Sequence, residues 1–428
     1  MKIPPVKGTR DFYPEQMRIR NFIIDGWKAA SLRNGFEEYD GPIFEHLQMY
    51  QVKSGDEIAE QLFSLTDRGG RELAIRPEIT PTLARMVNQK INSLPRPIKW
   101  FSVPRLCRAE RPQKGRLREF FQWNVDIIGV DDPLADAETI FCALDYLLQV
   151  GLTANDIVVK ISSRKMLAQV LEAIGIEQKQ LESVYAVLDK RNKVPDETFE
   201  QMLKGCIGDS AKRAQVLGVM SIKSLEEIAS VVKMNDRLAP AIDDLKKLFE
   251  TLGVMGVGEF CEFDIGIVRG LAYYTGIVYE IYDKGAELRA IGGGGRYDDL
   301  LKTFGGPAIP ATGFGIGDCV LEILLAKKGL LEKQSSGGKR IDCFVAYAAE
   351  QFKSKAVEIT AGLRRKKISA DFSYKGGNLG KQLKEASSQN AAMCIIIGSE
   401  IENGDLVVKD MVTGEQRTVK EDEFFASL

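Results

Sequence analysis

Histidine is almost missing from this sequence: the 428 residues include one, His46. A metal site built on a pair of histidines is therefore excluded, and acid–base catalysis by histidine is restricted to this residue. The seven cysteines form no C-x-x-C pair, so neither a four-thiolate zinc site nor a disulfide framework is indicated. We expect a cytoplasmic protein whose chemistry depends on other side chains.

Long apolar runs and a large net charge are also lacking. No apolar segment approaches membrane-spanning length, and the first fourteen residues include three prolines and no apolar core. We therefore expect neither a membrane span nor a secretory signal. The chain has 58 Lys and Arg against 60 Asp and Glu, so binding of nucleic acid would have to depend on local basic patches.

The apolar pattern changes along the chain and indicates several domains. Short apolar runs between residues 37 and 129 predict strands of a mostly antiparallel sheet, whereas helical periodicity dominates residues 153–258. Glycine-rich strand patterns return at 260–317, which indicates that a helical segment is inserted into the sheet domain. After the polar stretch EKQSSGGKR, strands and helices alternate, which predicts a small α/β domain.

We therefore predict an α+β fold with an antiparallel-sheet core, a helical insertion and a small α/β domain. The predicted ranges are 1–152 and 259–331 for the two parts of the core, 153–258 for the insertion, 332–339 for a linker and 340–428 for the last domain. The alternation in the last range fits the usual loop lengths of such a domain.

The most basic segment is RLCRAERPQKGRLR, residues 105–118, in which six basic side chains accompany one acidic side chain, Glu110. One guanidinium group can bind two phosphate oxygens at once, and it stabilises the charge on a transferring phosphoryl group. A basic loop between strands therefore suits a polyanion. A solvated charged hairpin is the alternative. We favour the polyanion because Pro112 and Gly115 suit a loop that folds over a ligand.

Three further segments are weak signals when each is taken alone. RGLAYYTGIVYEIY, residues 269–282, fits a strand whose aromatic side chains pack in a core without any ligand. The glycines of GGGGRYDDL, residues 292–300, would let the backbone approach a ligand closely, but a tight turn or a bulge needs glycine as well. Glu78 could pair with a substrate ammonium, although an isolated carboxylate at a strand end is usually solvated.

Taken together and in order, these motifs resemble those of histidyl-tRNA synthetases. They are KGTRDFYP at 7–14, GPIFEHL at 41–47, RPE at 76–78, RAERPQKGR at 108–116, RGLAYYTG at 269–276 and GGGGRYD at 292–298. The resemblance spans residues 7–325, and the domain after the linker is similar to the anticodon-binding domain of this subgroup of class II synthetases.

The resemblance implies an enzyme that activates L-histidine with ATP and transfers it to tRNA(His). It also implies a homodimer, with ATP and Mg²⁺ as the substrate complex and no tightly bound prosthetic group; the Mg²⁺ ligands are unknown. In the last domain, residues 339–385 carry eleven basic against five acidic side chains, a patch that suits the anticodon stem, although solvated helix ends often look the same.

Roles for individual residues follow from the same resemblance. Arg108 and Arg269 would stabilise the α-phosphate of ATP when the histidine carboxylate attacks it. Histidine-binding roles fall on Glu78, Thr80, Gln122, Asp126, Tyr273 and Tyr274; ATP-binding roles on Arg108, Glu110, Arg116, Arg118, Gly293 and Gly317; and contacts with the tRNA acceptor end on Arg111 and Gln113.

Three positions depart from the pattern of the family. The family commonly has Asp in place of Ala272 and Glu in place of Asp126. At Val320, most class II synthetases have an arginine that binds the γ-phosphate, and we expect Arg116 or Arg118 to substitute for it.

Other functions compete with the ligase. A non-catalytic, histidine-binding regulatory subunit of ATP phosphoribosyltransferase is the principal alternative, and Val320 favours it slightly. The retained Arg108, Glu110 and Arg269 argue against it, as does the last domain, which that subunit generally lacks. A synthetase for another amino acid and a structural tRNA-binding protein are further alternatives that the motifs disfavour.

Overall fold

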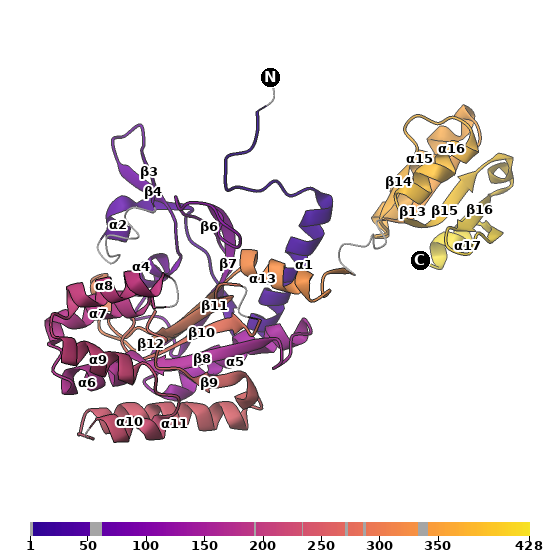
Figure 1. The fold of residues 1–428 in the computed structure, drawn as a ribbon. Helices are drawn as coiled ribbons and strands as arrows, with labels where there is room; N and C mark the ends of the chain where they lie inside the picture. The colour runs from indigo at the N-terminus through magenta and orange to yellow at the C-terminus, as the bar shows by residue number, and fades with distance from the viewer. Residues whose placement is uncertain are drawn as a thin grey trace. The chain divides into compact units, whose positions relative to one another are not determined.

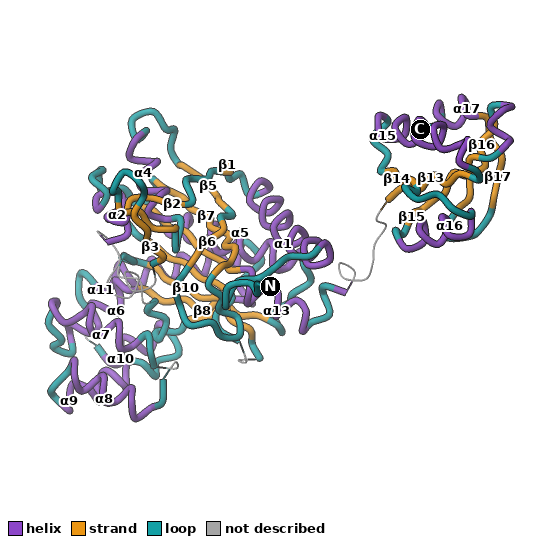
Figure 2. Tube along the Cα trace, turned by 90° about the horizontal axis from the view of Figure 1, so that it is seen from above, coloured by secondary structure: helices purple, strands orange, loops and turns teal. Residues whose placement is uncertain are grey.

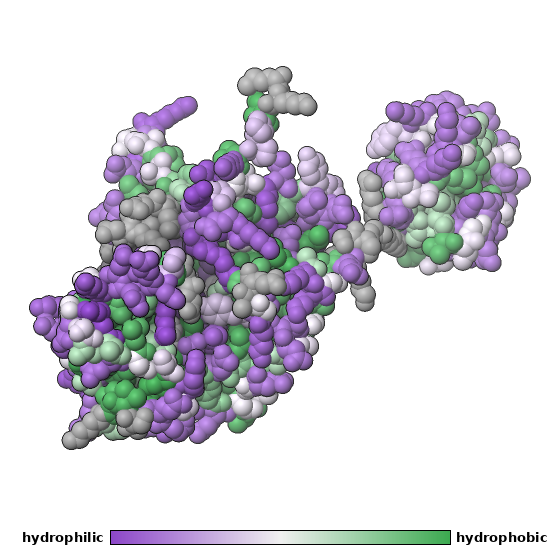
Figure 3. Space-filling view, viewed as in Figure 1, coloured by the Kyte–Doolittle hydropathy of each residue, from purple (hydrophilic) through white to green (hydrophobic). Residues whose placement is uncertain are grey.

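The protein divides into two compact units, Met1–Leu330 and Leu331–Leu428 (Figure 1). The computed structural model describes residues 3–51, 62–191, 194–232, 234–269, 273–285, 288–332 and 341–428. No helix in these ranges is both long enough and apolar enough to cross a membrane. Figure 3 shows polar side chains over much of the visible surface of each unit, with apolar patches between them.

A nine-stranded sheet forms the core of the first unit. Its strands lie in the order β1-β5-β7-β12-β11-β10-β8-β9, and β6 pairs with β7 off this path. Their bounds are β1 (Glu37–Glu38), β5 (Ile98–Ser102), β6 (Arg105–Cys107), β7 (Glu119–Ile128), β8 (Ile157–Ser163), β9 (Cys261–Phe263), β10 (Ile277–Asp283), β11 (Gly292–Arg296) and β12 (Ala311–Gly317). The pairs at the two ends of the path are parallel and those between them are antiparallel. The predicted antiparallel core is confirmed.

Helices α1 (Pro14–Arg33) and α5 (Pro133–Gln149) pack together beside β7. Helix α5 begins directly after Asp132, whose side chain caps it by accepting a hydrogen bond from the backbone N–H of Leu134 at 2.8 Å. Trp27 of α1 stacks on Trp123 of β7, with ring centroids 6.1 Å apart, and both are fully buried. This stacking fixes α1 against the sheet.

A helical segment separates β8 from β9. Its helices are α6 (Arg164–Ala173), α7 (Leu181–Leu188), α8 (Asp196–Cys206), α9 (Ser210–Val219), α10 (Leu225–Val231) and α11 (Leu238–Val254). Helix α11 packs on α5 and on β8, and Figure 1 shows the segment gathered on the β8–β9 side of the sheet. Strand β8 belongs to the sheet although it lies inside the range 153–258, so the helical part of that range begins at Arg164. The domain boundaries stay predictions.

A second, three-stranded sheet is formed by residues that come before the basic segment in the sequence. It contains β2 (Phe44–His46), β3 (Phe63–Thr66) and β4 (Glu72–Ile75) in the order β2-β4-β3. The remaining helices of this unit are α2 (Leu47–Gln51), α4 (Thr80–Gln89), α12 (Leu300–Thr303) and α13 (Asp318–Lys327), with short 3₁₀ turns at Gln178–Gln180 and Gly258–Phe260. Strand β4 leads directly into the RPE motif and α4.

The second unit is a five-stranded sheet between helices. Its strands are β13 (Ile341–Tyr347), β14 (Ala370–Phe372), β15 (Ala391–Ile397), β16 (Asp405–Asp410) and β17 (Gln416–Lys420), in the order β14-β13-β15-β16-β17. Its helices are α15 (Lys353–Arg365), α16 (Leu379–Ser388) and α17 (Glu421–Ala426), with 3₁₀ turns at Glu350–Phe352 and Ser399–Asn403. Two apolar clusters, one with α15 and α17 and one with α16, cover opposite faces (Figure 2). The predicted small α/β domain is confirmed.

Candidate active site

A cavity of about 680 Å³ lies against the nine-stranded sheet. Its floor is made by adjacent strands, because Glu280 of β10, Gly293 of β11 and Gly315 of β12 are register partners. Its walls come from the basic segment, from the residues before β11 and from the first turn of α13. Segments far apart in the sequence therefore meet at one site.

The basic segment folds as a hairpin beside this cavity. The backbone N–H of Arg108 donates to the carbonyl of Arg118 at 2.8 Å, and Gln113 and Arg116 form an isolated bridge. Gly115 closes the turn with a φ of +74°, a conformation that favours glycine. The hairpin is thus ordered by its own backbone, and part of its basic surface faces the cavity.

Arg108 and Arg116 are held at the cavity wall by different partners. The Nε of Arg108 donates to the carbonyl of Pro77 at 3.0 Å, and its guanidinium lies over the ring of Phe120 at 5.2 Å. The Nε of Arg116 forms an ion pair with the buried Glu110 at 2.5 Å. Glu110 therefore holds a cation at the wall without filling the cavity.

Arg118 is held by backbone carbonyls, and its predicted ATP role stays a prediction. Its Nε donates to the carbonyl of Glu110 at 3.2 Å and its Nη1 to the carbonyl of Lys7 at 3.4 Å. It does not line the cavity, and neither does Arg111, whereas Gln113 does.

Arg269 lines the cavity and is held by an acid and an aromatic ring. Its Nη1 pairs with Glu280 at 3.2 Å, and its guanidinium lies 5.6 Å from the ring centroid of Tyr274. Tyr282 donates a hydrogen bond to the other oxygen of Glu280. Burial lowers the pKa of Arg269, but Tyr274 and Glu280 outweigh it and raise the pKa above its ordinary value. The residue has a φ of 57°, a strained backbone of the kind retained at functional sites.

The glycine run forms a strand and lets side chains of the neighbouring segments lie flat on the sheet. A Cβ on Gly293 would collide with Nη1 of Arg269, and a Cβ on Gly313 would collide with Oδ1 of Asp126. A Cβ on Gly315 would lie 2.9 Å from Nε2 of Gln122. These glycines leave room for protein side chains on the sheet, and the close approach of this backbone to a ligand stays a prediction.

Four predicted residues and Tyr297 form a second group, which contacts Arg269 through Tyr274. The ring of Tyr273 is 4.7 Å from that of Tyr274, and Tyr297 donates a hydrogen bond to Asp126. Burial raises the pKa of Tyr273 well above its ordinary value, with further contributions from Tyr274 and Glu78. We call Glu78, Asp126, Tyr273, Tyr274 and Tyr297 the carboxylate–tyrosine cluster.

Glu78 contributes a carboxylate oxygen without a partner to this cluster. Its side chain is buried, and Oε1 has no hydrogen-bond partner among the residues that the structure describes. A buried carboxylate oxygen without a donor is costly, so this atom is poised to accept a hydrogen bond from a ligand. Thr80, half-buried, is the first residue of α4, two positions further on.

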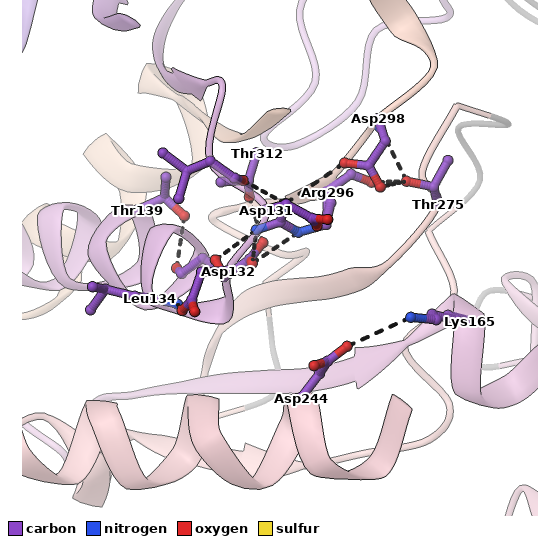
Figure 4. Close-up of polar contacts among 12 residues, drawn as sticks. Asp131, Asp132, Leu134, Thr139, Lys165, Asp244, Thr275, Arg296, Asp298 and Thr312 are labelled. Carbon is purple, nitrogen blue, oxygen red and sulfur yellow. Dashed lines mark hydrogen bonds and ion pairs between the residues drawn. The ribbon is translucent and has the colours of Figure 1, made fainter. Parts of the chain in front are cut away.

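Arg296, in the same motif as the glycine run, points away from the cavity into the core. It forms an ion pair with the fully buried Asp136 at 2.5 Å and donates to the carbonyls of Val130 and Asp132, each at 2.9 Å. Thr312 also donates to Asp136, at 2.7 Å. Complete burial raises the pKa of Asp136 to about 6, against the lowering effect of Arg296 and Thr312. Figure 4 shows Arg296 between the start of α5 and Asp298, so this arginine ties β11 to α5.

The structure thus brings most of the predicted residues to one place. The cavity is lined by Arg108, Glu110, Gln113, Arg116, Gln122, Arg269, Gly293 and Gly317. Val320 lines it as well, so the position without an arginine does face the cavity. Ala272 lies outside the described residues. Within the described chain, no group of three His, Cys, Asp or Glu side chains is placed to hold a metal ion.

Sequence reasoning missed Glu280, Tyr282, Arg289 and Tyr297. Glu280 and Tyr282 follow Arg269 by 11 and 13 residues, odd separations that would place them on the opposite face of one continuous strand, so strand alternation gave no reason to group them with Arg269. Tyr297 stands in the GGGGRYD motif and could have been found there. Arg289 is a lone arginine between two strands and gave no signal of its own.

The first unit combines an antiparallel sheet with an arginine-lined cavity, and an α/β domain follows it. This is the architecture of class II aminoacyl-tRNA synthetases. The solved structure of histidyl-tRNA synthetase from Nostoc sp. PCC 7120 has the same fold, with a TM-score of 0.80 at 22% sequence identity, covering 100% of this chain and 99% of that chain.

Sequence comparisons narrow the class to one family. The model of histidyl-tRNA synthetases matches residues 8–317, and a model of the anticodon-binding domain matches residues 342–428. The histidine–tRNA ligase of Opitutus terrae is 40% identical over 421 residues, 97% of this chain and 95% of the relative. The chloroplastic/mitochondrial histidine–tRNA ligase of Arabidopsis thaliana is 40% identical over 420 residues, 98% of this chain and 85% of the relative. The chain therefore belongs to the histidyl-tRNA synthetase family, and its activity is that of a histidine–tRNA ligase.

Proposed function

We propose that the cavity binds ATP, as its Mg²⁺ complex, and that the carboxylate–tyrosine cluster binds L-histidine. The observation that carries this proposal is Arg269, which lines the cavity and also lies over the ring of Tyr274. A single guanidinium thus stands between a site suited to a polyanion and a site suited to a small polar substrate. Reaction between the two ligands would take place beside it.

The reaction we propose is attack of the histidine carboxylate on the α-phosphorus of ATP. A carboxylate oxygen forms the new bond to phosphorus, the bond from that phosphorus to the β-bridging oxygen breaks, and pyrophosphate leaves with the electron pair. Negative charge grows on the non-bridging oxygens of the α-phosphate, and Arg108 and Arg269 stabilise it. The Pro77 carbonyl and Glu280 hold these two arginines before ATP arrives, which reduces the cost of ordering them.

The cluster offers histidine an acceptor at each end. The unsatisfied Oε1 of Glu78 accepts from the α-ammonium group, with Thr80 and Gln122 beside it in this proposal. Asp126 and Tyr274 hold the imidazole ring, and the Asp126 carboxylate keeps the orientation that Tyr297 gives it. A substrate without ring nitrogens would leave buried polar groups unpaired and is rejected for that reason.

The transfer step concerns tRNA(His). We propose that Arg111 and Gln113, on the hairpin, contact the acceptor end, and that the basic side chains of the second unit attract the anticodon stem. The second unit is supported in this role by its match to the anticodon-binding domain. A homodimer and a cytoplasmic location complete the proposal.

A regulatory subunit of ATP phosphoribosyltransferase is the weaker alternative. Two histidine–tRNA ligases match this chain at 40% identity over nearly its whole length. The anticodon-binding domain, which the regulatory function does not need, is also present as a match over residues 342–428.

ATP–pyrophosphate exchange with each of the twenty amino acids tests the proposal, because activation needs no tRNA. We expect exchange with histidine alone, and its loss in Arg269→Ala. Lys284→Ala, an exposed position on the β10–β11 connection, is the control and should exchange at the wild-type rate. Histidine binding without exchange in the wild-type protein would favour the regulatory subunit.

A further inference from the structure

We propose that Arg289 binds the leaving pyrophosphate, that is, the β- and γ-phosphates of ATP. This inference rests on the proposed function and adds to it a residue that neither the motifs nor the predicted substitutes include. It assigns the terminal phosphates to the end of the cavity that Arg289, Arg116 and Val320 line together.

The first argument is the state of the four arginines of the cavity. Arg108, Arg116 and Arg269 each have a fixed protein partner: the carbonyl of Pro77, the carboxylate of Glu110 and the carboxylate of Glu280, respectively. Arg289 has no hydrogen bond or ion pair with another residue in the described ranges. Its five donors are therefore available to a ligand.

The second argument is that two guanidiniums face the same space. Burial lowers the pKa of Arg289, and the charge of Arg116 lowers it further, against a smaller raising effect of Glu110. Two cations that disfavour each other across a cavity are stabilised when an anion lies between them. Pyrophosphate carries several negative charges and presents oxygens to both arginines.

The third argument is the order of the groups along the cavity. Arg269 lies by Tyr274, so the α-phosphate belongs near the histidine site. The charges of Arg116 and Glu110 act on the pKa of Arg289, so these groups lie near it. A Cβ on Gly115, next to Arg116, would lie 3.0 Å from the side chain of Val320. An ATP whose α-phosphate is at Arg269 thus extends its remaining phosphates toward Arg289. Val320 itself contributes no positive charge to that space.

Exchange kinetics of Arg289→Ala test this assignment. We expect KM values for pyrophosphate and for ATP to rise about tenfold or more, since a hydrogen bond to a charged group is lost, while the KM for histidine stays unchanged. Arg289→Lys keeps the charge and should recover part of the loss. Lys284→Ala is the control on the same connection between β10 and β11 and should leave all three KM values unchanged.

The outcomes separate this inference from the proposed function. If the wild-type protein shows no histidine-dependent exchange, the proposed function fails. If the wild type exchanges and Arg289→Ala has wild-type KM values for ATP and pyrophosphate, Arg289 does not bind the leaving group. An equal rise in all three KM values would also overturn it, because that indicates a general disturbance of the site. Should Arg289→Ala fail to fold, Arg289→Gln is measured in the same way.

Discussion

The guanidinium of Arg269 occupies the space that a Cβ would fill on Gly293, its neighbour on β11. Arg269 can therefore lie on the sheet only because Gly293 has no side chain. In this position Arg269 has a positive φ and forms its ion pair with Glu280.

Gly293→Ala should therefore abolish activation while leaving the arginine in the protein. A displacement of about 1 Å at a catalytic group costs about 100-fold in rate, so we expect histidine-dependent exchange to fall by at least that factor. A Cβ at this position also meets the carbonyl of Tyr279, so a lower Tm is expected as well.

The matched control is Gly218→Ala on α9, where nothing lies within 4 Å of the added Cβ. It should have wild-type exchange and a wild-type or slightly higher Tm, because alanine favours a helix. Exchange is compared at a temperature at which circular dichroism shows all three proteins folded. Wild-type exchange by Gly293→Ala would contradict the relationship between Gly293 and Arg269.

Tyr297→Phe should weaken histidine binding without affecting ATP. The lost hydroxyl donates to Asp126, and a hydrogen bond to a charged group is worth enough to raise the KM for histidine about tenfold. Tyr146→Phe is the control, because the buried Tyr146 hydroxyl has no hydrogen-bond partner in the described structure. Equal KM values for histidine in Tyr297→Phe and wild type would remove Asp126 from the histidine site.

Local sequence patterns predicted the sheet, the helical segment and the last domain because each depends on short-range apolar periodicity. They could not show which side chains cross Gly293, Gly313 and Gly315, because these side chains come from other strands and loops. The sequence groups strand β8 with the helices because β8 stands directly before α6, and only its pairing with β10 assigns it to the sheet. Arg289 gives no signal for the same reason: Arg116, which lines the same cavity, lies more than 170 residues away in the sequence.

The buried pair Arg296–Asp136 should contribute strongly to the stability of the first unit. Asp136→Ala removes the buried carboxylate of Arg296 and leaves only the longer pairs with Asp298 and Asp131, at 3.7 and 3.9 Å, so we expect the free energy of unfolding to fall by roughly 3 kcal/mol. Asp131→Ala is the control, because Asp131 is 86% exposed and lies 3.9 Å from the same guanidinium, where a pair is worth little. Urea unfolding followed by tryptophan fluorescence measures both, since Trp27, Trp100 and Trp123 lie in the first unit. Similar losses in the two variants would contradict this assignment.

The same carboxyl gives the stability of the first unit a pH dependence. Burial raises the pKa of Asp136 from an unfolded value near 3.8 to about 6, so between these values the folded state binds more protons than the unfolded state. Its contribution to the free energy of unfolding is therefore largest below about pH 4 and decreases as the pH rises through 6. Asp136→Asn cannot titrate, so the stability of wild type relative to this variant should decrease from pH 4 to pH 7, as measured by urea unfolding at several pH values. A difference that instead increases over this range would mean that Arg296 holds the carboxyl ionised and that its pKa lies below 3.8.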